Sequence, residues 1–568
     1  MGVPYDVHEV ETRWREHWRA ERVGLIDDLD TADPARVFYN LVEFPYPSAE
    51  GLHVGHVFKY SGADAFGRYQ RMCGRDVFQP IGWDAFGIHT ENFALKLGQH
   101  PKDLTGRTTE TFRSQLSRGG MAWDWRHAVD TSSPTYYRWT QWLLVQLFNS
   151  GLMYQADAAV LWCPGCQTVL AREQTEDGGT RCERCASEVA EREMRQWFLR
   201  TTAYAERMLA GLERLDWSER AKRLQRQWIG RSEDPDGSVT YRLHDWLISR
   251  QRYWGPPIPI VHCPSCGPVA VPEDQLPVEL PDLVDFRPTG TGRSPLASVE
   301  EFVRTRCPSC GGPATRETDV SDTFVDSSWY FLRCPSVDFD DRPWDEGRTA
   351  RFLPVDFYAG GLEHVQRHHL YARFVTMALH DLGLVPFEEP FLKVRLGGLI
   401  PQDGAKMSKS RGNVVSPDGL VDRHGSDALR CALLFTAPWE QGGTFRVNTI
   451  AGIERFFTRL WRVVTEPAAP GAGKDGKGPM TQEDTVAHTV ARVTKAVEQL
   501  RFNVALAALM ELTRWIQTEL ADGPERHAAC RTATLLLAPL APHLAEELWC
   551  RLGVEPSVHT QPWPLSAP

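Results

Sequence analysis

Two short clusters of side chains, far apart in the chain, have residue types that bind phosphate groups. The first contains His53, Gly55 and His56, which follow a turn-rich segment and begin a helix-like stretch. Side chains three residues apart at a helix start share one face, and the helix N-terminus offers backbone N–H groups and partial positive charge to a phosphate. Gly55 leaves room for a base or a ribose to approach. Taken alone, such a tetrapeptide is more often part of an ordinary surface helix.

The second cluster places two lysines and two serines in a loop bounded by Gly404 and Gly412. Lysine acts as a point charge on phosphate oxygens, and serine hydroxyls supply further donors. A solvated basic loop is the ordinary explanation of one isolated cluster of this kind. Both clusters in one chain, separated by an interrupted α/β pattern, instead indicate a loop that closes over a triphosphate. The second cluster consists of Lys406, Met407, Ser408, Lys409 and Ser410.

Eight of the 13 cysteines fall into four Cys-x-x-Cys pairs. The first two pairs are about 15 residues apart, a spacing typical of a zinc ribbon with two knuckles. The last two are separated by a longer loop, but each lies in a Cys-Pro-Ser-Cys-Gly sequence. Four thiolates leave no position for a substrate, so we predict two structural Zn²⁺ sites. Their ligands are Cys163, Cys166, Cys182 and Cys185 in the first site, and Cys263, Cys266, Cys307 and Cys310 in the second.

The residue pattern also predicts the elements that position these side chains. A β-branched and aromatic run at 37–44 predicts a strand, and after a turn rich in proline the run at 54–72 predicts a helix. This is the opening of a nucleotide-binding α/β unit, which resumes with a strand at 355–359 after the cysteine-rich regions. We further predict a buried helix at 135–154, a flexible linker at 467–479 and a helical bundle over 481–552.

Bulk composition sets broader limits. With 568 residues, of which 42% are hydrophobic and 24% charged, the chain has the composition of a soluble globular protein with roughly three or four domains. A net charge of -11 argues against a broad basic surface that coats nucleic acid, although a local basic groove can exist in an acidic protein. The apolar run at 532–540 is too short to cross a membrane, and the N-terminus lacks signal-peptide features. We therefore expect a cytoplasmic protein without membrane contact.

Residues 45–56 and 406–410 resemble the paired HIGH and KMSKS signatures of class I aminoacyl-tRNA synthetases. Longer strings resemble the leucyl type over nearly the whole chain. These strings are Phe-Pro-Tyr-Pro-Ser at 44–48, Gly-Trp-Asp-Ala-Phe-Gly at 82–87, Trp-Thr-Gln-Trp at 139–142, Trp-Cys-Pro at 162–164, Gln-Trp-Phe at 196–198, Trp-Ile-Gly-Arg-Ser at 228–232, Ser-Arg-Gln-Arg-Tyr-Trp-Gly at 249–255, Asp-Ser-Ser-Trp-Tyr at 326–330 and Leu-Ala-Pro-Leu-Ala-Pro-His at 537–543.

The resemblance implies an α/β fold of the class I synthetase type. We expect a Rossmann-type catalytic domain with a parallel sheet, zinc-ribbon insertions, and then an α-helical bundle of the anticodon-binding type. The expected boundaries are 1–155 for the first half of the catalytic domain, 156–192 for the first zinc ribbon, 193–258 for a connective segment, 259–325 for the second ribbon, 326–430 for the second half of the catalytic domain, and 431–568 for the bundle.

The resemblance also implies a reaction. Leucine would be activated by ATP to leucyl-adenylate and transferred to tRNA(Leu), with Mg²⁺ accompanying ATP and the chain acting as a monomer. Catalysis would be positioning and stabilisation of charge rather than covalent chemistry. The implied catalytic residues are His53, His56, Lys406 and Lys409, and the implied ATP-binding residues are Gly55, Gly360, Gly361, Glu363, Met407, Ser408 and Ser410.

Three further residues match the amino-acid site of this family. Asp84 corresponds to the residue that holds the α-ammonium group, and Phe44 and Tyr46 would line the side-chain pocket. Aromatic residues beside a buried strand are usually just core, so these two assignments compete with a packing role. Asp84 is the stronger assignment because a carboxylate among apolar neighbours would otherwise lack a partner.

The sequence departs from the family at several points. Only residues 233–248 lie between the strings at 228–232 and 249–255, where bacterial leucyl enzymes usually carry a large editing domain, so we expect no post-transfer editing. The sequence also stops soon after the bundle, where many relatives continue into a C-terminal domain, and Glu43 stands where methionine is frequent. An alternative is a paralogue that supplies aminoacyl-adenylate or aminoacyl-tRNA to a natural-product pathway, or an inhibitor-resistant duplicate.

Overall fold

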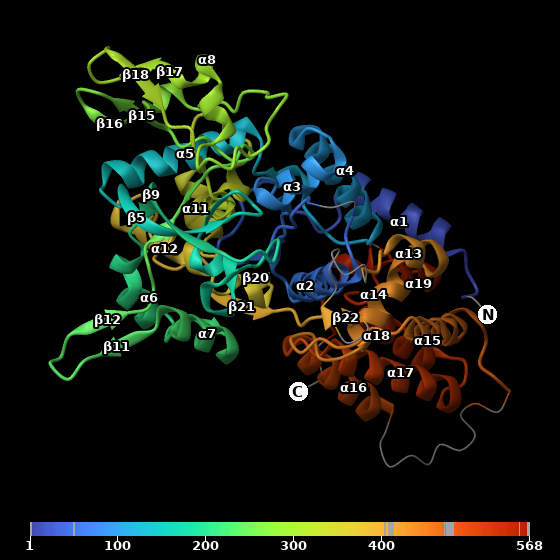
Figure 1. Ribbon diagram of the computed structural model, residues 1–568. Coiled ribbons are helices and arrows are strands. Elements are labelled where there is room, and N and C mark those ends of the chain that lie inside the picture. Colours follow the sequence, from blue (N-terminus) through green and yellow to red (C-terminus); the bar gives the residue numbers. More distant parts are fainter. Residues whose placement is uncertain are drawn as a thin grey trace.

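A five-stranded parallel sheet lies at the centre of the molecule (Figure 1). The computed structural model describes residues 3–48, 51–402, 405–406, 414–470, 472, 482–555 and 557–564. Successive residues of the first strand pack into two different hydrophobic cores, Leu41 into one and Val42 into the other, as expected for a sheet covered on both faces. The strand order is β10 (Asp216–Trp217), β21 (Lys393–Leu396), β20 (Phe357–Gly360), β1 (Val37–Val42) and β2 (Asp76–Phe78), with every pairing parallel.

The strand order changes direction between β1 and β20. From β1 the chain runs through α2 (Val54–Met72) to β2 on one side, whereas from β20 it runs through α12 (His368–Asp381) to β21 on the other. In open α/β sheets, ligands bind outside the carboxyl ends of the strands at such a switch point. The strand, turn and helix predicted at 37–72 are therefore confirmed, and they meet the end of β20 at one edge of the sheet.

One predicted helix ends earlier than expected. Helix α5 (Pro134–Asn149) is followed by Gly151 in a left-handed conformation with φ of +76°, and the chain then enters β5 (Met153–Cys163). The prediction of a helix to residue 154 was therefore wrong at its C-terminal end. Strand β5 pairs with β9 (Ala190–Leu199) along nearly its whole length. The backbone N–H and C=O groups of residues 153 and 154, which the prediction placed in the helix, are therefore part of a β-sheet.

The two cysteine-rich regions are small β structures. The first is built on β5, β6 (Thr168–Leu170) and β8 (Arg181–Cys182). The second is a four-stranded sheet at the far end of the molecule from the helical bundle (Figure 1). Its strands, in spatial order, are β16 (Gly267–Ala270), β15 (Ile260–Cys263), β18 (Pro313–Arg316) and β17 (Arg304–Arg306).

A short hairpin lies within the segment at 228–255, where the sequence led us to expect no editing domain. Strands β11 (Arg231–Glu233) and β12 (Val239–Tyr241) pair antiparallel and project from the molecule beyond α6 (Ala205–Gly211) and α7 (Glu219–Ile229) (Figure 1). Residues 231–240 are all exposed. The hairpin is thus a surface turn without a core of its own.

The last third of the chain forms the predicted helical bundle. It is joined by the N-terminal helix α1 (Val7–Ala20), where Trp14 Nε1 donates to Glu547 Oε2 at 2.9 Å and Trp18 Nε1 donates to Glu546 Oε2 at 2.8 Å. No helix in the described ranges is long and apolar enough to cross a membrane. The bundle helices are α14 (Ser426–Phe435), α15 (Asn448–Thr465), α16 (Gln482–Glu498), α17 (Phe502–Glu519), α18 (Pro524–Leu537) and α19 (Pro542–Arg551).

Candidate active site

Both histidines of the first cluster lie at the N-terminus of α2. His53 is the N-cap residue, and its Nδ1 accepts a hydrogen bond from Gly55 N at 3.1 Å. His56 Nδ1 accepts from His53 N at 3.3 Å, and the two rings stack with centroids 3.9 Å apart. Because each Nδ1 accepts a backbone N–H, the neutral imidazoles carry their proton on Nε2. Two N–H donors at a helix N-terminus are suited to phosphate oxygens.

The chain on the two sides of the second cluster is described, and its downstream side is bonded to the same helix terminus. Upstream, Ala405 and Lys406 form β23, which pairs with β22 (Pro401–Gln402) in a short hairpin. Downstream, Val54 N donates to Val415 O at 3.0 Å, so the chain that leaves the cluster is bonded to the first residue of α2. The side chain of Lys406 and all of Met407, Ser408, Lys409 and Ser410 lie outside the described residues.

A buried carboxylate, Glu43, joins the ends of β1 and β20. Its Oε2 accepts from Gly361 N at 2.6 Å, and its Oε1 lies 2.7 Å from His364 Nε2. Lys59 Nζ on α2 lies 3.4 Å from Oε2. Burial raises the pKa of the Glu43 carboxyl, but His364 and Lys59 outweigh burial and hold the pKa well below its usual value. An ionised Glu43 therefore fixes the turn in which Gly360 and Gly361 lie.

Asp84 is buried beside this turn without a counter-ion. Its side chain is 2% exposed, and Oδ1 accepts from Thr323 Oγ1 at 2.8 Å. No ion pair joins Asp84 to a basic side chain within the described part of the chain. Burial raises the pKa of Asp84 to about 8, although hydrogen bonds from Thr323 and Tyr46 oppose the shift. An ammonium group that entered this site would supply the missing positive charge.

The two predicted aromatic residues have different surroundings. Phe44 stacks on Tyr330 with ring centroids 4.0 Å apart, and a Cβ added to Gly82 would lie 2.3 Å from the Phe44 ring. Phe44 is thus packed on two sides, as a core residue is. Tyr46 stacks on His364 at 5.9 Å and also hydrogen bonds to Asp84, so it lies between the two polar groups of the site.

Sequence reasoning missed four residues that the fold adds to this site. Lys59 contacts Glu43, and Thr323 donates a hydrogen bond to Asp84. Tyr330 stacks on Phe44, and His364 stacks on Tyr46. Tyr330 and His364 lie in or beside sequence strings that carried the family resemblance, so a signal for them existed. Thr323 and Lys59 had none, because their contacts join residues far apart in the sequence. Glu363, which was predicted to bind ATP, is exposed on the turn after Gly361.

Each group of four cysteines converges. Within each group, the four Sγ atoms all lie within 4.8 Å of one another. In the first, Cys163 Sγ lies 3.3 Å from Cys185 Sγ and Cys166 Sγ lies 3.9 Å from Cys182 Sγ. A tetrahedral Zn²⁺ with Zn–S bonds of about 2.3 Å separates its sulfurs by about 3.8 Å. The spacing of the eight thiols therefore fits two such ions.

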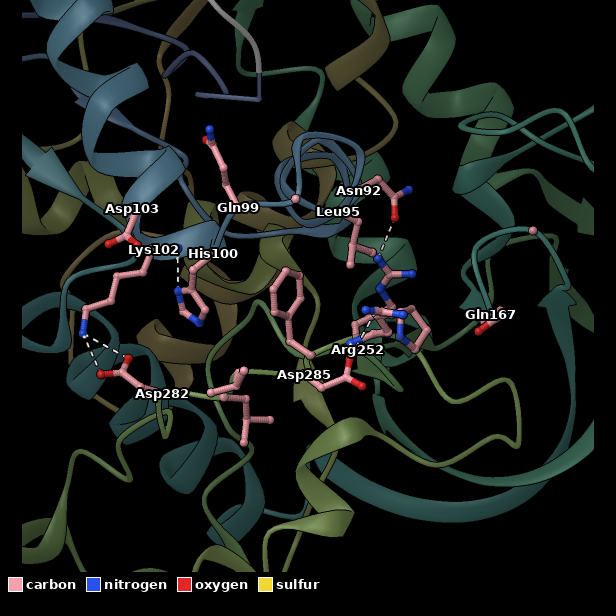
Figure 2. A pocket seen from close by; sticks show the side chains of 17 residues that line it. Asn92, Leu95, Gln99, His100, Lys102, Asp103, Gln167, Arg252, Asp282 and Asp285 are labelled. Atoms are coloured by element: carbon pink, nitrogen blue, oxygen red, sulfur yellow. Dashed lines mark hydrogen bonds and ion pairs between the residues drawn. The ribbon is translucent and has the colours of Figure 1, made fainter.

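A cavity of about 1000 Å³ lies elsewhere, between α3 (Ile88–Leu97), the start of α4 (Pro101–Arg118) and the loop at 282–288. Figure 2 shows the side chains that line it, among them Lys102 beside Asp282 and Arg252 beside Asn92. Lys102 Nζ lies 3.1 Å from Asp282 Oδ1, and Arg252 donates to Asn92 Oδ1 at 2.6 Å. None of the residues predicted to bind ATP or the amino acid lines this cavity.

Comparisons with known proteins agree with this architecture. A family model described as tRNA synthetases class I (I, L, M and V) matches residues 14–442, and one described as the anticodon-binding domain of tRNA ligase matches residues 484–568. A leucine-tRNA ligase of Rubrobacter xylanophilus is 37% identical over 99% of this chain and 90% of that protein. The corresponding enzyme of Thermotoga petrophila is 34% identical over 99% of this chain and 92% of its own.

Solved structures give the same result. A ternary complex of Agrobacterium radiobacter K84 agnB2 LeuRS with tRNA and LeuAMS aligns with a TM-score of 0.91 and 31% identity, over 99% of this chain and 90% of that chain. Methionyl-tRNA synthetase of Mycobacterium tuberculosis in complex with methionyl-adenylate has a TM-score of 0.66 at 19% identity, over 92% and 94% of the two chains, and shares the fold.

The parallel sheet, the histidine cluster at the start of α2, the helical bundle and the matching family models define a class I aminoacyl-tRNA synthetase. Within that class, the chain belongs to the leucine-tRNA ligase family. The alignment with the Rubrobacter enzyme extends over 742 residues against the 568 of this chain, so that relative carries segments which this chain lacks.

Proposed function

We propose that this protein activates leucine with ATP and transfers the leucyl group to tRNA(Leu), without post-transfer editing. The observation that carries the proposal is the convergence, at the switch point of the sheet, of His53 and His56, the flanks of the second signature and the uncompensated Asp84. A phosphate site and an ammonium site at one sheet edge suit a substrate pair of ATP and an amino acid.

In the proposed activation step, a carboxylate oxygen of leucine bonds to the α-phosphorus of ATP, and the bond from that phosphorus to the pyrophosphate oxygen breaks. Negative charge develops on the phosphate oxygens. The Nε2 donors of His53 and His56, together with Lys406 and Lys409, would stabilise this charge, and Asp84 would hold the α-ammonium group. Mg²⁺ bound to the phosphates supplies additional positive charge, and the protein need not provide a dedicated cage for it.

ATP–pyrophosphate exchange with each aliphatic amino acid, followed by charging of bulk tRNA, tests the proposal. We expect exchange that prefers leucine, and leucine incorporation into tRNA. Exchange with leucine but no charged tRNA would favour a paralogue that supplies leucyl-adenylate. An absence of exchange with every amino acid would overturn both. A monomeric state and a cytoplasmic location stay predictions that gel filtration and fractionation can check.

Replacement of Lys409 by alanine is expected to reduce exchange by roughly 10²–10³-fold, the usual effect of losing one preorganised donor to transition-state charge. The melting temperature should not change, because the polar, glycine-bounded sequence around Lys409 has no apolar periodicity that would predict core packing. Lys102→Ala, which removes an exposed lysine paired with Asp282, is the matched control and should retain full exchange. Unchanged exchange in Lys409→Ala would remove this lysine from the mechanism.

Replacement of Glu43 by glutamine is expected to lower kcat/KM for ATP by about tenfold to a hundredfold, because hydrogen bonds to a charged group contribute about 1.5–3 kcal/mol. The amide would leave Lys59 and His364 without their carboxylate and would loosen the turn at Gly361. Steady-state exchange kinetics measure the effect. Glu300→Gln, at an exposed carboxylate paired with Arg304, should behave like the native protein. Equal kinetics in both variants would show that Glu43 has no positioning role.

We also propose that the two cysteine clusters each hold one structural Zn²⁺. Metal analysis of the purified protein should give two equivalents of zinc per chain. Cys182→Ser and Cys307→Ser should each lose one equivalent and lower the melting temperature, because a structural zinc site contributes folding free energy. Cys73→Ser, at an exposed thiol outside both clusters, is the control and should keep two equivalents. Full zinc content in Cys182→Ser or Cys307→Ser would contradict the assignment.

A further inference from the structure

A cavity of about 390 Å³, here called the arginine pocket, lies between α1, the C-terminal half of α2, α4 and the segment at 120–126. It is remote from the candidate active site, because Arg71 lies about 22 Å further along α2 than His56 at 1.5 Å per residue. Among the described residues that line it, Asp124 is the one carboxylate. The arginines that line it are Arg15, Arg19, Arg22, Arg68, Arg71, Arg113 and Arg126.

Some of this positive charge is neutralised inside the protein. Arg68 Nε lies 3.0 Å from Asp64 Oδ2, Arg126 Nη2 lies 2.7 Å from Asp124 Oδ2, and Arg22 lies 3.8 Å from Asp27. Arg15 donates to the Arg118 carbonyl oxygen and to a threonine hydroxyl, which are both uncharged. In contrast, no ion pair joins Arg19, Arg71 or Arg113 to a carboxylate within the ranges that the structure describes. The pocket therefore retains a surplus of positive charge in a protein whose net charge is -11.

Arg71 is half-buried and has no ion pair to a carboxylate in the described ranges. Burial and the neighbouring Arg68 lower the pKa of Arg71 to about 10, and the charge of Asp64 opposes this shift. Gly24, in a left-handed conformation with φ of +74°, leaves space for it, since a Cβ there would lie 2.8 Å from Arg71 Cζ. An anion in the pocket would therefore meet a guanidinium group that has no carboxylate partner.

Two tryptophans form part of the pocket wall. Trp123 lines the pocket and is 3% exposed, and its indole Nε1 is enclosed by protein, so it contributes an apolar wall and no donor to a ligand. Arg113 lies over the Trp125 ring, with its Cζ 5.1 Å from the ring centroid, which holds its guanidinium at the rim.

We propose that the arginine pocket is a second, non-catalytic binding site for the phosphate chain of a small molecule, either an inorganic polyphosphate or a nucleotide. Its volume lies in the range of small-molecule sites, and guanidinium groups match phosphate geometry through paired N–H donors. Arg71 is its central donor, with Arg19, Arg22 and Arg113 at the rim. The proposal does not depend on which amino acid the enzyme activates.

Isothermal titration of the full-length protein with sodium tripolyphosphate tests this proposal. The catalytic site is first saturated with a non-hydrolysable aminoacyl-adenylate analogue. Binding to the arginine pocket is then the part of the titration that differs between the native protein and Arg71→Ala. We expect one equivalent of tripolyphosphate per chain. Its affinity should fall at least tenfold in Arg71→Ala and at least threefold in Arg113→Ala. Arg304→Ala, which removes an exposed arginine elsewhere, is the control and should bind as the native protein does.

Further titrations separate the sources of the phosphate. ATP and pyrophosphate distinguish a nucleotide from an inorganic ligand, and adenosine measures any contribution of the base. Arg71→Gln, which keeps more of the side chain, guards against a folding defect in Arg71→Ala. Equal affinity in the native protein and both Arg71 variants, or no saturable binding at all, would overturn the proposal. If the Arg71 variants lose affinity for tRNA but not for tripolyphosphate, the pocket binds the tRNA backbone and the small-molecule site is wrong.

Discussion

Replacement of Asp84 by asparagine is expected to reduce kcat/KM for leucine by roughly 30-fold to a few thousand-fold, because removal of one partner of a buried charge pair costs about 2–5 kcal/mol. The variant keeps the hydrogen bond to Thr323 but loses the negative charge for the ammonium group. ATP–pyrophosphate exchange at varied leucine concentration measures the loss. The KM for ATP should change little, since Asp84 is proposed to bind the amino acid and does not lie at the start of α2.

The pH dependence should identify the same group. Burial raises the pKa of Asp84 to about 8, so at lower pH the free enzyme holds a neutral carboxylic acid that cannot pair with an ammonium ion. In the native protein, kcat/KM for leucine should therefore rise with pH by up to about tenfold per unit until it levels near pH 8. In Asp84→Asn this rise should disappear.

Asp282→Asn is the control for both measurements, because Asp282 is an exposed carboxylate paired with Lys102. It should retain native kinetics and the native pH profile. A native profile that is flat below pH 8, or one that persists in Asp84→Asn, would show that another group governs leucine binding.

We expect that this enzyme does not hydrolyse tRNA(Leu) charged with a wrong amino acid. Shape selection between aliphatic side chains contributes about 1–3 kcal/mol, or roughly 10–200-fold in specificity. Residues 231–240 of the hairpin β11–β12 are exposed, so the hairpin has no core of its own that could enclose a second, hydrolytic pocket. Isoleucine and valine should therefore support exchange within about 10–200-fold of leucine in kcat/KM.

Deacylation of tRNA(Leu) charged with isoleucine provides the second readout. The rate of hydrolysis should be the same with and without the protein. A variant in which residues 234–238 are replaced by glycine and serine is the matched control and should give the same rate, because this turn carries no proposed function. Protein-dependent hydrolysis in the native chain that the variant loses would place an editing activity in the hairpin.

Local chemistry allowed several features to be predicted from the sequence. The strand, turn and helix at 37–72 follow from side-chain periodicity and from prolines that break it, and both are local properties. Cysteine spacing predicted two clusters of four thiols, since each Cys-x-x-Cys turn presents both sulfurs on one side. Family membership followed from long strings such as 249–255 and not from periodicity. By contrast, helix α5 was predicted to run too far, because its end depends on pairing between β5 and β9.

The sequence by itself therefore determined which side chains are available: histidines and lysines that can donate to phosphate, one carboxylate that can pair with an ammonium group, and thiols that can bind a metal. Tertiary structure decided which of these groups meet. The hydrogen bond from Val54 to Val415, the contact of Glu43 with Gly361 and His364, and the seat of Arg71 beside Gly24 all join segments far apart in the chain. Such contacts depend on strand order and helix packing, and no local pattern encodes them.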